Sequence, residues 1–177
     1  MDKPMPNLAF QFMSLAFKVR DFLLPRKDVL NEVGIKPGFH ILDYGCGPGS
    51  YSVIAAGLVG PKGKVYALDI HPLAIRRVQE KSAKMGLTNI HTISSDRETG
   101  LEDAAVDVVL LYDTFHHLSD SDALLKELHR VLKPAGILSF SDHHMKEGDI
   151  LSQVTHKGLF KLSKKGRKTY CFLKEKG

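Results

Sequence analysis

Residues 41–52 read ILDYGCGPGSYS, and this stretch decides the fold of the chain. An apolar run ends at Asp43, glycines follow at the alternate positions 45, 47 and 49, and a helical pattern begins near Ser50. Glycine lets the backbone adopt positive φ and approach a ligand closely. The free N–H groups of a helix N-terminus also bind polar ligand groups. The stretch therefore predicts a ligand-binding turn between a buried strand and a helix.

On both sides of this turn, short β-rich runs alternate with longer helical patterns, which indicates a parallel α/β sheet. The run VDVVLLY at 106–112 is apolar almost throughout, as in a central strand that is covered on both faces. Pro72 and Gly86 bracket one helix, as residues at its first and post-terminal positions should. The predicted strands are 39–43, 64–69, 90–94, 106–112, 137–141, 159–163 and 169–173, and the predicted helices are 50–60, 72–85 and 121–132.

The last two predicted strands carry the positive charge of the chain. They are joined by a short basic turn with Gly166, which predicts an antiparallel hairpin. The whole chain has a net charge of +5. From Lys157 onward there are eight Lys or Arg and one Glu, so the rest of the chain has 17 basic and 19 acidic groups. The hairpin is interpreted either as a solvated sheet edge or as a surface for RNA, anionic lipid or an anionic acceptor.

Size and composition predict one compact, soluble domain. The chain has 177 residues, of which 43% are hydrophobic and 25% are charged. Neither a signal peptide nor an apolar run of roughly 18 residues is found, so we expect a cytoplasmic protein without stable membrane insertion. Cys46 and Cys171 are far apart and share no metal-ligand spacing. We divide the domain into a helical cap at 1–35 and a binding domain at 36–177.

The N-terminal segment has a helical pattern with two apolar faces. One face carries Leu8, Phe12, Leu15, Val19 and Phe22, and the other carries Phe10, Met13, Phe17 and Leu24. A single sheet surface cannot cover a helix that is apolar on two sides. Three interpretations stay open, namely a helix wedged into the core, a cover over a substrate pocket, and a contact with a second copy or a membrane surface.

Three acidic residues stand at successive strand ends beside the glycine turn. Asp69 follows Gly49 by twenty residues and can accept hydrogen bonds from a ribose diol, and Asp96 can accept from an adenine amino group. The dinucleotide signature is G-x-G-x-x-G, whereas the spacing here is G-x-G-x-G. A carboxylate as close as Asp43 would repel a pyrophosphate and would suit a cationic amino group. The charge pattern thus favours the methionine end of S-adenosylmethionine (SAM) over NAD.

The chain resembles the class I SAM-dependent methyltransferases, and within them the group similar to ubiquinone and menaquinone methyltransferases. The resemblance rests on ILDYGCGPGSYS, VYALDI, SSD, DVVLLYDTFHHL and LHRVLKPAGILSFSD, which cover residues 38–142 in order. It implies a Rossmann-like, doubly wound, seven-stranded sheet that is mostly parallel with an antiparallel C-terminal strand. It also implies SAM as methyl donor and S-adenosylhomocysteine (SAH) as product. The cofactor-binding residues expected from it are Asp43, Tyr44, Gly45, Cys46, Gly47, Gly49, Tyr51, Asp69, Ile70, Ser95, Asp96, Arg97 and Tyr112. Tyr44 and Arg97 depart from the commonly aliphatic and small residues at their positions.

The methyl acceptor should bind at the carboxyl ends of the fourth and fifth strands. Asp113, His116 and His117 are the candidate catalytic residues there, with histidine as a plausible base at neutral pH, and structural or SAM-facing roles are the alternative. Asp142, His143 and His144 at the end of the next strand belong to the same polar set, with a solvated loop as the alternative for His143 and His144. His71 is expected beside the adenine. Adjacent histidines usually point apart, so no metal is expected.

We expect a small-molecule acceptor and no nucleic-acid partner. A homodimer contact, if one forms, should involve the N-terminal helix. An RNA or protein methyltransferase and a non-catalytic SAM-binding module are the alternatives.

Overall fold

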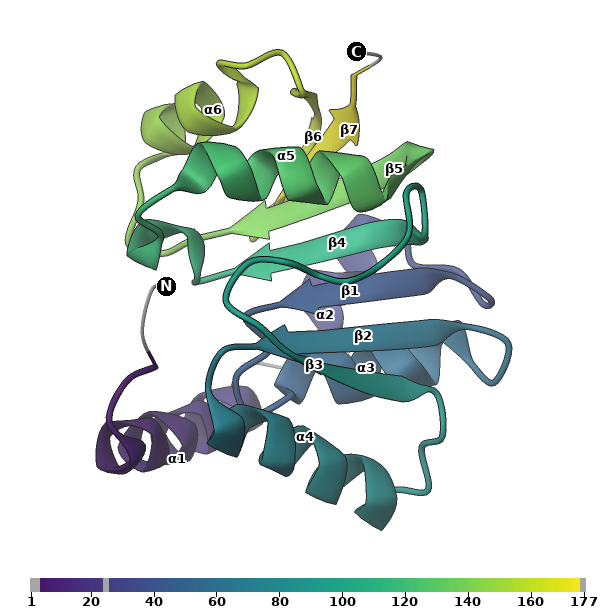
Figure 1. Ribbon diagram of the computed structural model, residues 1–177, viewed down its shortest axis with the longest axis vertical. Coiled ribbons are helices and arrows are strands. Elements are labelled where there is room, and N and C mark those ends of the chain that lie inside the picture. The colour runs from purple at the N-terminus through teal and green to yellow at the C-terminus, as the bar shows by residue number, and fades with distance from the viewer. Residues whose placement is uncertain (1–3, 24–25, 176–177) are drawn as a thin grey trace.

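A seven-stranded sheet in the order β3-β2-β1-β4-β5-β7-β6 forms the centre of the protein (Figure 1). The computed structural model describes the backbone of residues 4–23 and 26–175, and the side chains of residues 4–15 and 26–175. The strands are β1 (His40–Tyr44), β2 (Lys64–Asp69), β3 (Ile90–Ser94), β4 (Val106–Tyr112), β5 (Leu132–Ser141), β6 (Phe160–Lys165) and β7 (Tyr170–Lys174). Strands β1 to β5 pair in parallel, and β7 pairs antiparallel with both β5 and β6. The predicted Rossmann-like sheet is confirmed.

Helices cover both faces of the sheet. The α2 (Arg26–Val33), α3 (Ser50–Val59) and α4 (Pro72–Lys84) helices pack on one face, and α5 (Ser121–Val131) and α6 (Glu147–Thr155) pack on the other. The α1 helix (Asn7–Leu23) lies beside α4 (Figure 1). Successive side chains of a strand point to opposite faces. Ile41 therefore packs toward α3, and Leu42 and Tyr44 pack toward α5.

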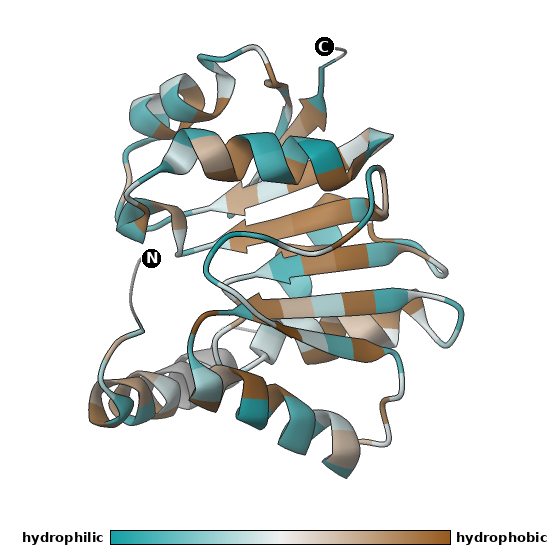
Figure 2. Cartoon of the chain, viewed as in Figure 1, coloured by the Kyte–Doolittle hydropathy of each residue, from teal (hydrophilic) through white to brown (hydrophobic). Residues whose placement is uncertain are grey.

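The central strands are apolar on both faces, as the sequence predicted. Figure 2 shows β4 brown along almost its whole length. Val108, Val109, Leu110 and Leu111 of β4 are all completely buried. Each such side chain contributes about 1.5–3 kcal/mol by leaving water. This core fixes the strand ends, and the strand ends carry the site.

Three features of the fold were not predicted. No helix was predicted at α2 or α6, which have only eight and nine residues. Helices this short are stabilised by tertiary packing more than by the helix propensity of their residues. The start of β5 was also predicted at residue 137 instead of Leu132. The strand begins earlier because Leu132 pairs with Val106 across an irregularity in the β4–β5 register.

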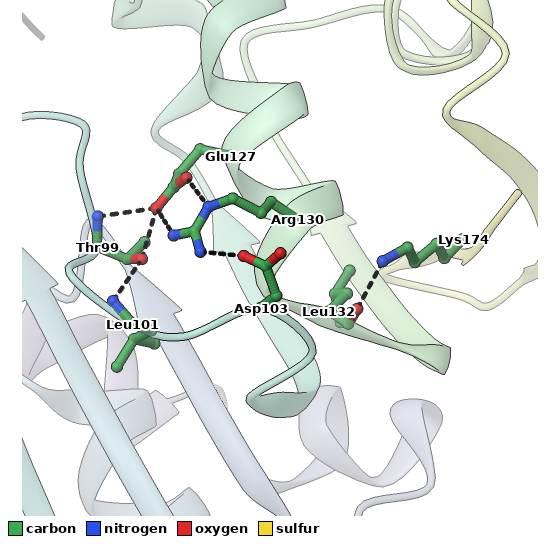
Figure 3. Close-up of polar contacts among 7 residues, drawn as sticks. All are labelled: Thr99, Leu101, Asp103, Glu127, Arg130, Leu132 and Lys174. Atoms are coloured by element: carbon green, nitrogen blue, oxygen red, sulfur yellow. Dashed lines mark hydrogen bonds and ion pairs between the residues drawn. The ribbon is translucent and has the colours of Figure 1, made fainter. Parts of the chain in front are cut away.

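A polar cluster anchors the loop between β3 and β4 to α5 (Figure 3). The Glu127 carboxylate accepts from the backbone N–H and the hydroxyl of Thr99 and from Arg130, and Arg130 also donates to Asp103. The hydrogen bond from Arg130 lowers the pKa of Glu127 to about 2. Nearby, Lys174 of β7 donates to the carbonyl oxygen of Leu132. The cluster holds in place a loop that begins with Ser95 and Asp96.

Within the described ranges, none of the helices combines the length and the apolar character needed to cross a membrane.

Candidate cofactor and acceptor site

The glycine turn follows β1 directly and is held against β2. The backbone N–H groups of Gly45 and Cys46 both donate to the carbonyl oxygen of Leu68, at 2.9 Å. Gly45 has a φ of +73°, and a Cβ atom there would collide with the side chain of Thr114. Gly49 has a φ of +78°, and a Cβ atom would lie 2.7 Å from Cγ2 of Val78. Both positions therefore require glycine.

A pocket of about 740 Å³, including the part open to solvent, lies where the carboxyl ends of β1, β2 and β4 meet; we call it the main pocket. The predicted residues that line it are Gly45, Cys46, Gly47, Tyr51, Asp69, Ile70, Tyr112, Asp113 and His117, and His71, which was expected beside the adenine, lines it as well. Unpredicted lining comes from Pro48, Ser50 and Thr114. The N-terminal segment closes one side with Met5, Phe10 and Met13.

A second, narrower hollow of about 230 Å³ adjoins the main pocket; we call it the slot. Its lining residues are Tyr44, Gly45, Leu68, Asp69, Ile70, Ser95, Asp96, Thr114 and Leu118. Gly45, Asp69, Ile70 and Thr114 line both hollows, so they form the junction between them. This division suits a ligand with a flat ring in the slot, a sugar at the junction and a polar chain in the main pocket.

Asp69 is the charged group at this junction. Its two carboxylate oxygens accept from the backbone N–H groups of Gly47 and His71, each at 2.8 Å. A carboxylate oxygen has two lone pairs, so each oxygen keeps one for a ligand hydroxyl. Burial raises the pKa of Asp69, although the two N–H groups favour the ionised form. Asp69 is thus placed to accept from a diol.

Asp43 does not line the main pocket or the slot. Its side chain points to the α3 face of the sheet, where it accepts from the hydroxyl of Ser52 at 2.5 Å. Burial, together with the charge of Asp69, raises the pKa of Asp43 to about 6. At neutral pH its negative charge lies directly behind the turn, where it disfavours an anionic ligand without touching one.

The predicted catalytic residues fall into two groups. Asp113 and His117 line the main pocket. His116 does not line it, because its Nδ1 is bound to Asp142 at 2.8 Å and its backbone N–H also donates to that carboxylate. Asp113 has a φ of +51°, and its carboxylate accepts from the backbone N–H of His143 and contacts Nδ1 of His143 at 2.7 Å.

The four histidines after β4 and β5 contact one another in sequence, with each pair of rings tilted by 41–48°. The ring centroids lie 3.8 Å apart for His117 and His116, 4.3 Å for His116 and His144, and 3.8 Å for His144 and His143. The expectation that adjacent histidines point apart is therefore wrong here. Among the described residues, no group of three or more His, Cys, Asp or Glu is arranged to hold a metal ion.

The N-terminal helix covers the main pocket with one of its two apolar faces. Phe10 is 1% exposed and stacks on His71 with ring centroids 4.2 Å apart. His71 caps α4 by accepting from the N–H of Leu73, and its Nε2 lies 3.0 Å from the carbonyl oxygen of Met5. On the opposite face, Leu8 and Phe12 are 65% and 67% exposed. The side chains of Phe17, Val19, Phe22 and Leu24 lie outside the described residues.

The remaining predicted residues divide around the slot. Ser95, Asp96 and Tyr44 line it, whereas Arg97 lies in an adjacent hollow beside Asp120. Thr114 lines both the slot and the main pocket and was missed. Its position directly after the strand-end pair Tyr112-Asp113 was the signal that could have found it.

A family model described as a methyltransferase domain matches residues 35–177. Demethylmenaquinone methyltransferase of Geobacillus stearothermophilus is 32% identical over 126 residues, which are 71% of this chain and 54% of that protein. The protein of that name from Staphylococcus aureus (strain JH9) is 32% identical over 114 residues, or 64% of this chain and 46% of the other. The chain thus spans about half the length of these curated relatives.

Among solved structures, a SAM-dependent methyltransferase from Aquifex aeolicus is similar over the whole chain. Its TM-score is 0.82 at 28% identity, and the match covers 96% of both chains. An arsenic(III) SAM methyltransferase from Chlamydomonas reinhardtii has a TM-score of 0.66 at 23% identity, covering 80% of this chain and 65% of the other, a likeness of fold.

Proposed function

The chain belongs to the methyltransferase domain family as a SAM-dependent methyltransferase, and on this premise we propose that it methylates a small acceptor with a planar, apolar body. The observation that supports this most is the composition of the main pocket. Its outer wall is formed by Phe10, Met13 and Met5, and its inner wall by the edge-to-face pair of Tyr51 and Tyr112, whose ring centroids lie 4.7 Å apart. Apolar and aromatic walls with a few polar groups are typical of small-molecule sites.

We assign SAM to the two hollows together. Asp96 in the slot would accept from the adenine amino group, Asp69 at the junction would accept from the ribose diol, and the glycine turn beside the main pocket would hold the methionine part. The charges of Asp43 and Asp69 favour the ammonium group of the methionine part and disfavour a pyrophosphate. When bound, SAM supplies a methyl group on a positively charged sulfur that leaves as a neutral thioether.

The name shared by the two relatives described above points to the acceptor class. Both are demethylmenaquinone methyltransferases, and this supports an aromatic acceptor of the naphthoquinol type for the main pocket. The division into a cap at 1–35 and a binding domain at 36–177 belongs to this proposal, since Phe10 and Met13 of α1 would cover that acceptor.

His117 is the residue we assign to removal of the acceptor's proton. It lines the main pocket, and burial, followed by the neighbouring His116, lowers its pKa below the ordinary 6.5. A neutral imidazole at neutral pH can accept a proton. Asp142 and His116 would act through His117, because Asp142 fixes the His116 ring that His117 contacts. Asp113, which also lines the main pocket, would orient the acceptor.

The basic hairpin supports a small-molecule acceptor over a nucleic acid. Several of its lysines are bound within the protein, namely Lys161 to Glu175, Lys165 to Glu147, Lys164 to the Glu32 carbonyl oxygen and Lys174 to the Leu132 carbonyl oxygen. A homodimer contact through the exposed face of α1 and a cytoplasmic location stay predictions.

The test is methyl transfer from labelled SAM to a reduced naphthoquinol without a side chain. We expect transfer that His117→Gln slows by about 100-fold, because general-base catalysis commonly contributes that much or more. The SAH affinity should stay within twofold. The matched control is His156→Gln, which should keep full activity. His156 is exposed, is bound to Asp122 of α5 and does not line the main pocket. Equal rates for the two variants would contradict the role of His117. No transfer to any naphthoquinol, together with salt-sensitive methylation of RNA, would contradict the acceptor class.

A further inference from the structure

Tyr44 joins two strands that do not pair with each other. It is the last residue of β1, and its hydroxyl donates to the backbone carbonyl oxygen of Asp96, after β3, at 2.6 Å. Strand β2 lies between β1 and β3 in the sheet, so the side chain spans the end of a whole strand. Tyr44 is 3% exposed and packs in the core cluster under α5. Burial raises the pKa of its hydroxyl, which therefore remains a neutral donor.

The segment that receives this hydrogen bond forms one wall of the slot. Its start is held by the N–H of Ser95, which donates to the carbonyl oxygen of Asp69, and by Ser95 Oγ, which accepts from the N–H of Arg97. Beyond it, Arg97 lies 3.6 Å from Asp120, across the adjacent hollow. Among the described groups, which are the backbone of residues 4–23 and 26–175 and the side chains of residues 4–15 and 26–175, none forms a hydrogen bond with the Asp96 carboxylate, so its oxygens can accept from a ligand.

We propose that Tyr44 is a positioning residue that sets the recognition of the adenine amino group by holding the backbone of Asp96. The proposal rests on the placement of adenine in the slot described above. An aliphatic residue at position 44 would fill the same core space but could not reach across β2 with a donor. Without the hydroxyl, the carbonyl oxygen of Asp96 loses its partner, and the carboxylate beside it is no longer held at one place relative to the slot.

A role in positioning predicts a change in ligand selectivity that a merely structural role does not. SAH carries an amino group at C6 of its base, and S-inosylhomocysteine carries a carbonyl oxygen there. A carboxylate accepts from the first and is repelled by the second, so the wild-type protein should bind SAH at least about tenfold more tightly.

The experiment is calorimetric titration of both ligands into the wild-type protein, Tyr44→Phe and Asp96→Ala. Tyr44→Phe keeps the ring and the core packing and should weaken SAH binding by about three- to tenfold, the range of one hydrogen bond. Binding of the inosine compound should change less than twofold, so the affinity ratio falls. In the Asp96→Ala background, Tyr44→Phe should not change the ratio further. Tyr66→Phe, in the neighbouring strand and outside both hollows, is the matched control.

Each outcome separates this inference from the function on which it rests. A lower ratio in Tyr44→Phe supports the role of Tyr44. If Tyr44→Phe weakened the binding of both ligands equally, Tyr44 would only support the fold in general. This result would overturn the role of Tyr44 but not the proposed function. A wild-type protein that binds both ligands equally would overturn the placement of adenine against Asp96 as well. Absence of SAH binding in the wild-type protein would contradict the proposed function itself.

Discussion

Asp43 shows at the scale of one residue how a site charge affects stability. Its pKa is raised to about 6 in the folded protein, chiefly by burial, from an ordinary 3.8. Between about pH 4 and 6 the folded state therefore holds more protons than the unfolded chain, and stability falls as the pH rises through this window. Above the pKa of Asp43 in the folded protein, the buried, ionised carboxylate lowers the stability by its full amount.

Asp43→Asn removes this titration and keeps an oxygen for the hydroxyl of Ser52. The difference in free energy of unfolding between the variant and the wild-type protein should shift in favour of the variant by roughly 2 kcal/mol from about pH 4 to pH 8. Urea denaturation at both pH values measures the difference. A stability difference between the two proteins that does not change with pH would show that Asp43 ionises normally in the folded state.

The sequence could predict which residues gather at the site but not what each one touches. The spacing of Asp69 and Asp96 after their strands placed both beside the glycine turn, and both line the hollows there. The contact of Asp43 with Ser52 depends on which face of β1 the side chain meets. The contact between the His116 and His117 rings depends on a short 3-10 turn, Phe115–His117, that no periodicity signals.

At the scale of elements, α1 provides a matched pair of phenylalanines. Phe10 is buried over the main pocket, and Phe12, two residues later, is 67% exposed. Truncating a buried phenylalanine costs about 3 kcal/mol or more, whereas an exposed one costs little. Phe10→Ala should therefore release α1 from the protein and open the acceptor site, and Phe12→Ala should not.

Hydrogen exchange of the α1 amide groups measures this directly. We expect Phe10→Ala to lower their protection by about 100-fold, the equivalent of roughly 3 kcal/mol, and Phe12→Ala to leave it unchanged. Similar protection in the two variants would mean that α1 is not held to the pocket through Phe10.

The C-terminal hairpin is attached to α2 through one carboxylate. Glu32 accepts from the backbone N–H groups of Arg167, Lys168 and Thr169 and from the hydroxyl of Thr169. Partial burial opposes ionisation of Glu32, but these hydrogen bonds outweigh it and lower the pKa below the ordinary 4.5. The stabilisation is thus present above about pH 4.5 and is lost as the pH falls through the lowered value.

Glu32→Gln should lower the free energy of unfolding by roughly 1 kcal/mol at neutral pH, with a smaller effect in acid. Glu80→Gln is the control, because Glu80 is exposed and, among the described residues, forms an ion pair with Arg76 alone, on its own helix. Such a contact is worth at most about 0.5 kcal/mol. Thermal denaturation at two pH values compares the variants. A Glu32 effect no larger than that of Glu80 would rule out the anchor.

At the scale of the whole molecule, the alternation of strands and helices in the sequence predicted the architecture. The apolar runs of the central strands indicate burial on both faces, as in a parallel sheet that helices cover on both sides. The short α2 and α6 helices could not be predicted, because their stability comes from packing on strands distant in sequence. The lining of the main pocket could be predicted only in part, for the same reason. Its outer wall comes from Phe10 and Met13, which meet the strand ends only once the chain has folded.

The central claim is that the glycine turn and Asp69 bind SAM and not a dinucleotide. Calorimetric titration of the protein with SAH and, separately, with NAD tests it most directly. The expected result is binding of SAH in the micromolar range, about 100-fold weaker in Asp69→Ala through loss of charged hydrogen bonds, and no detectable binding of NAD. Micromolar binding of NAD together with no binding of SAH would contradict the claim.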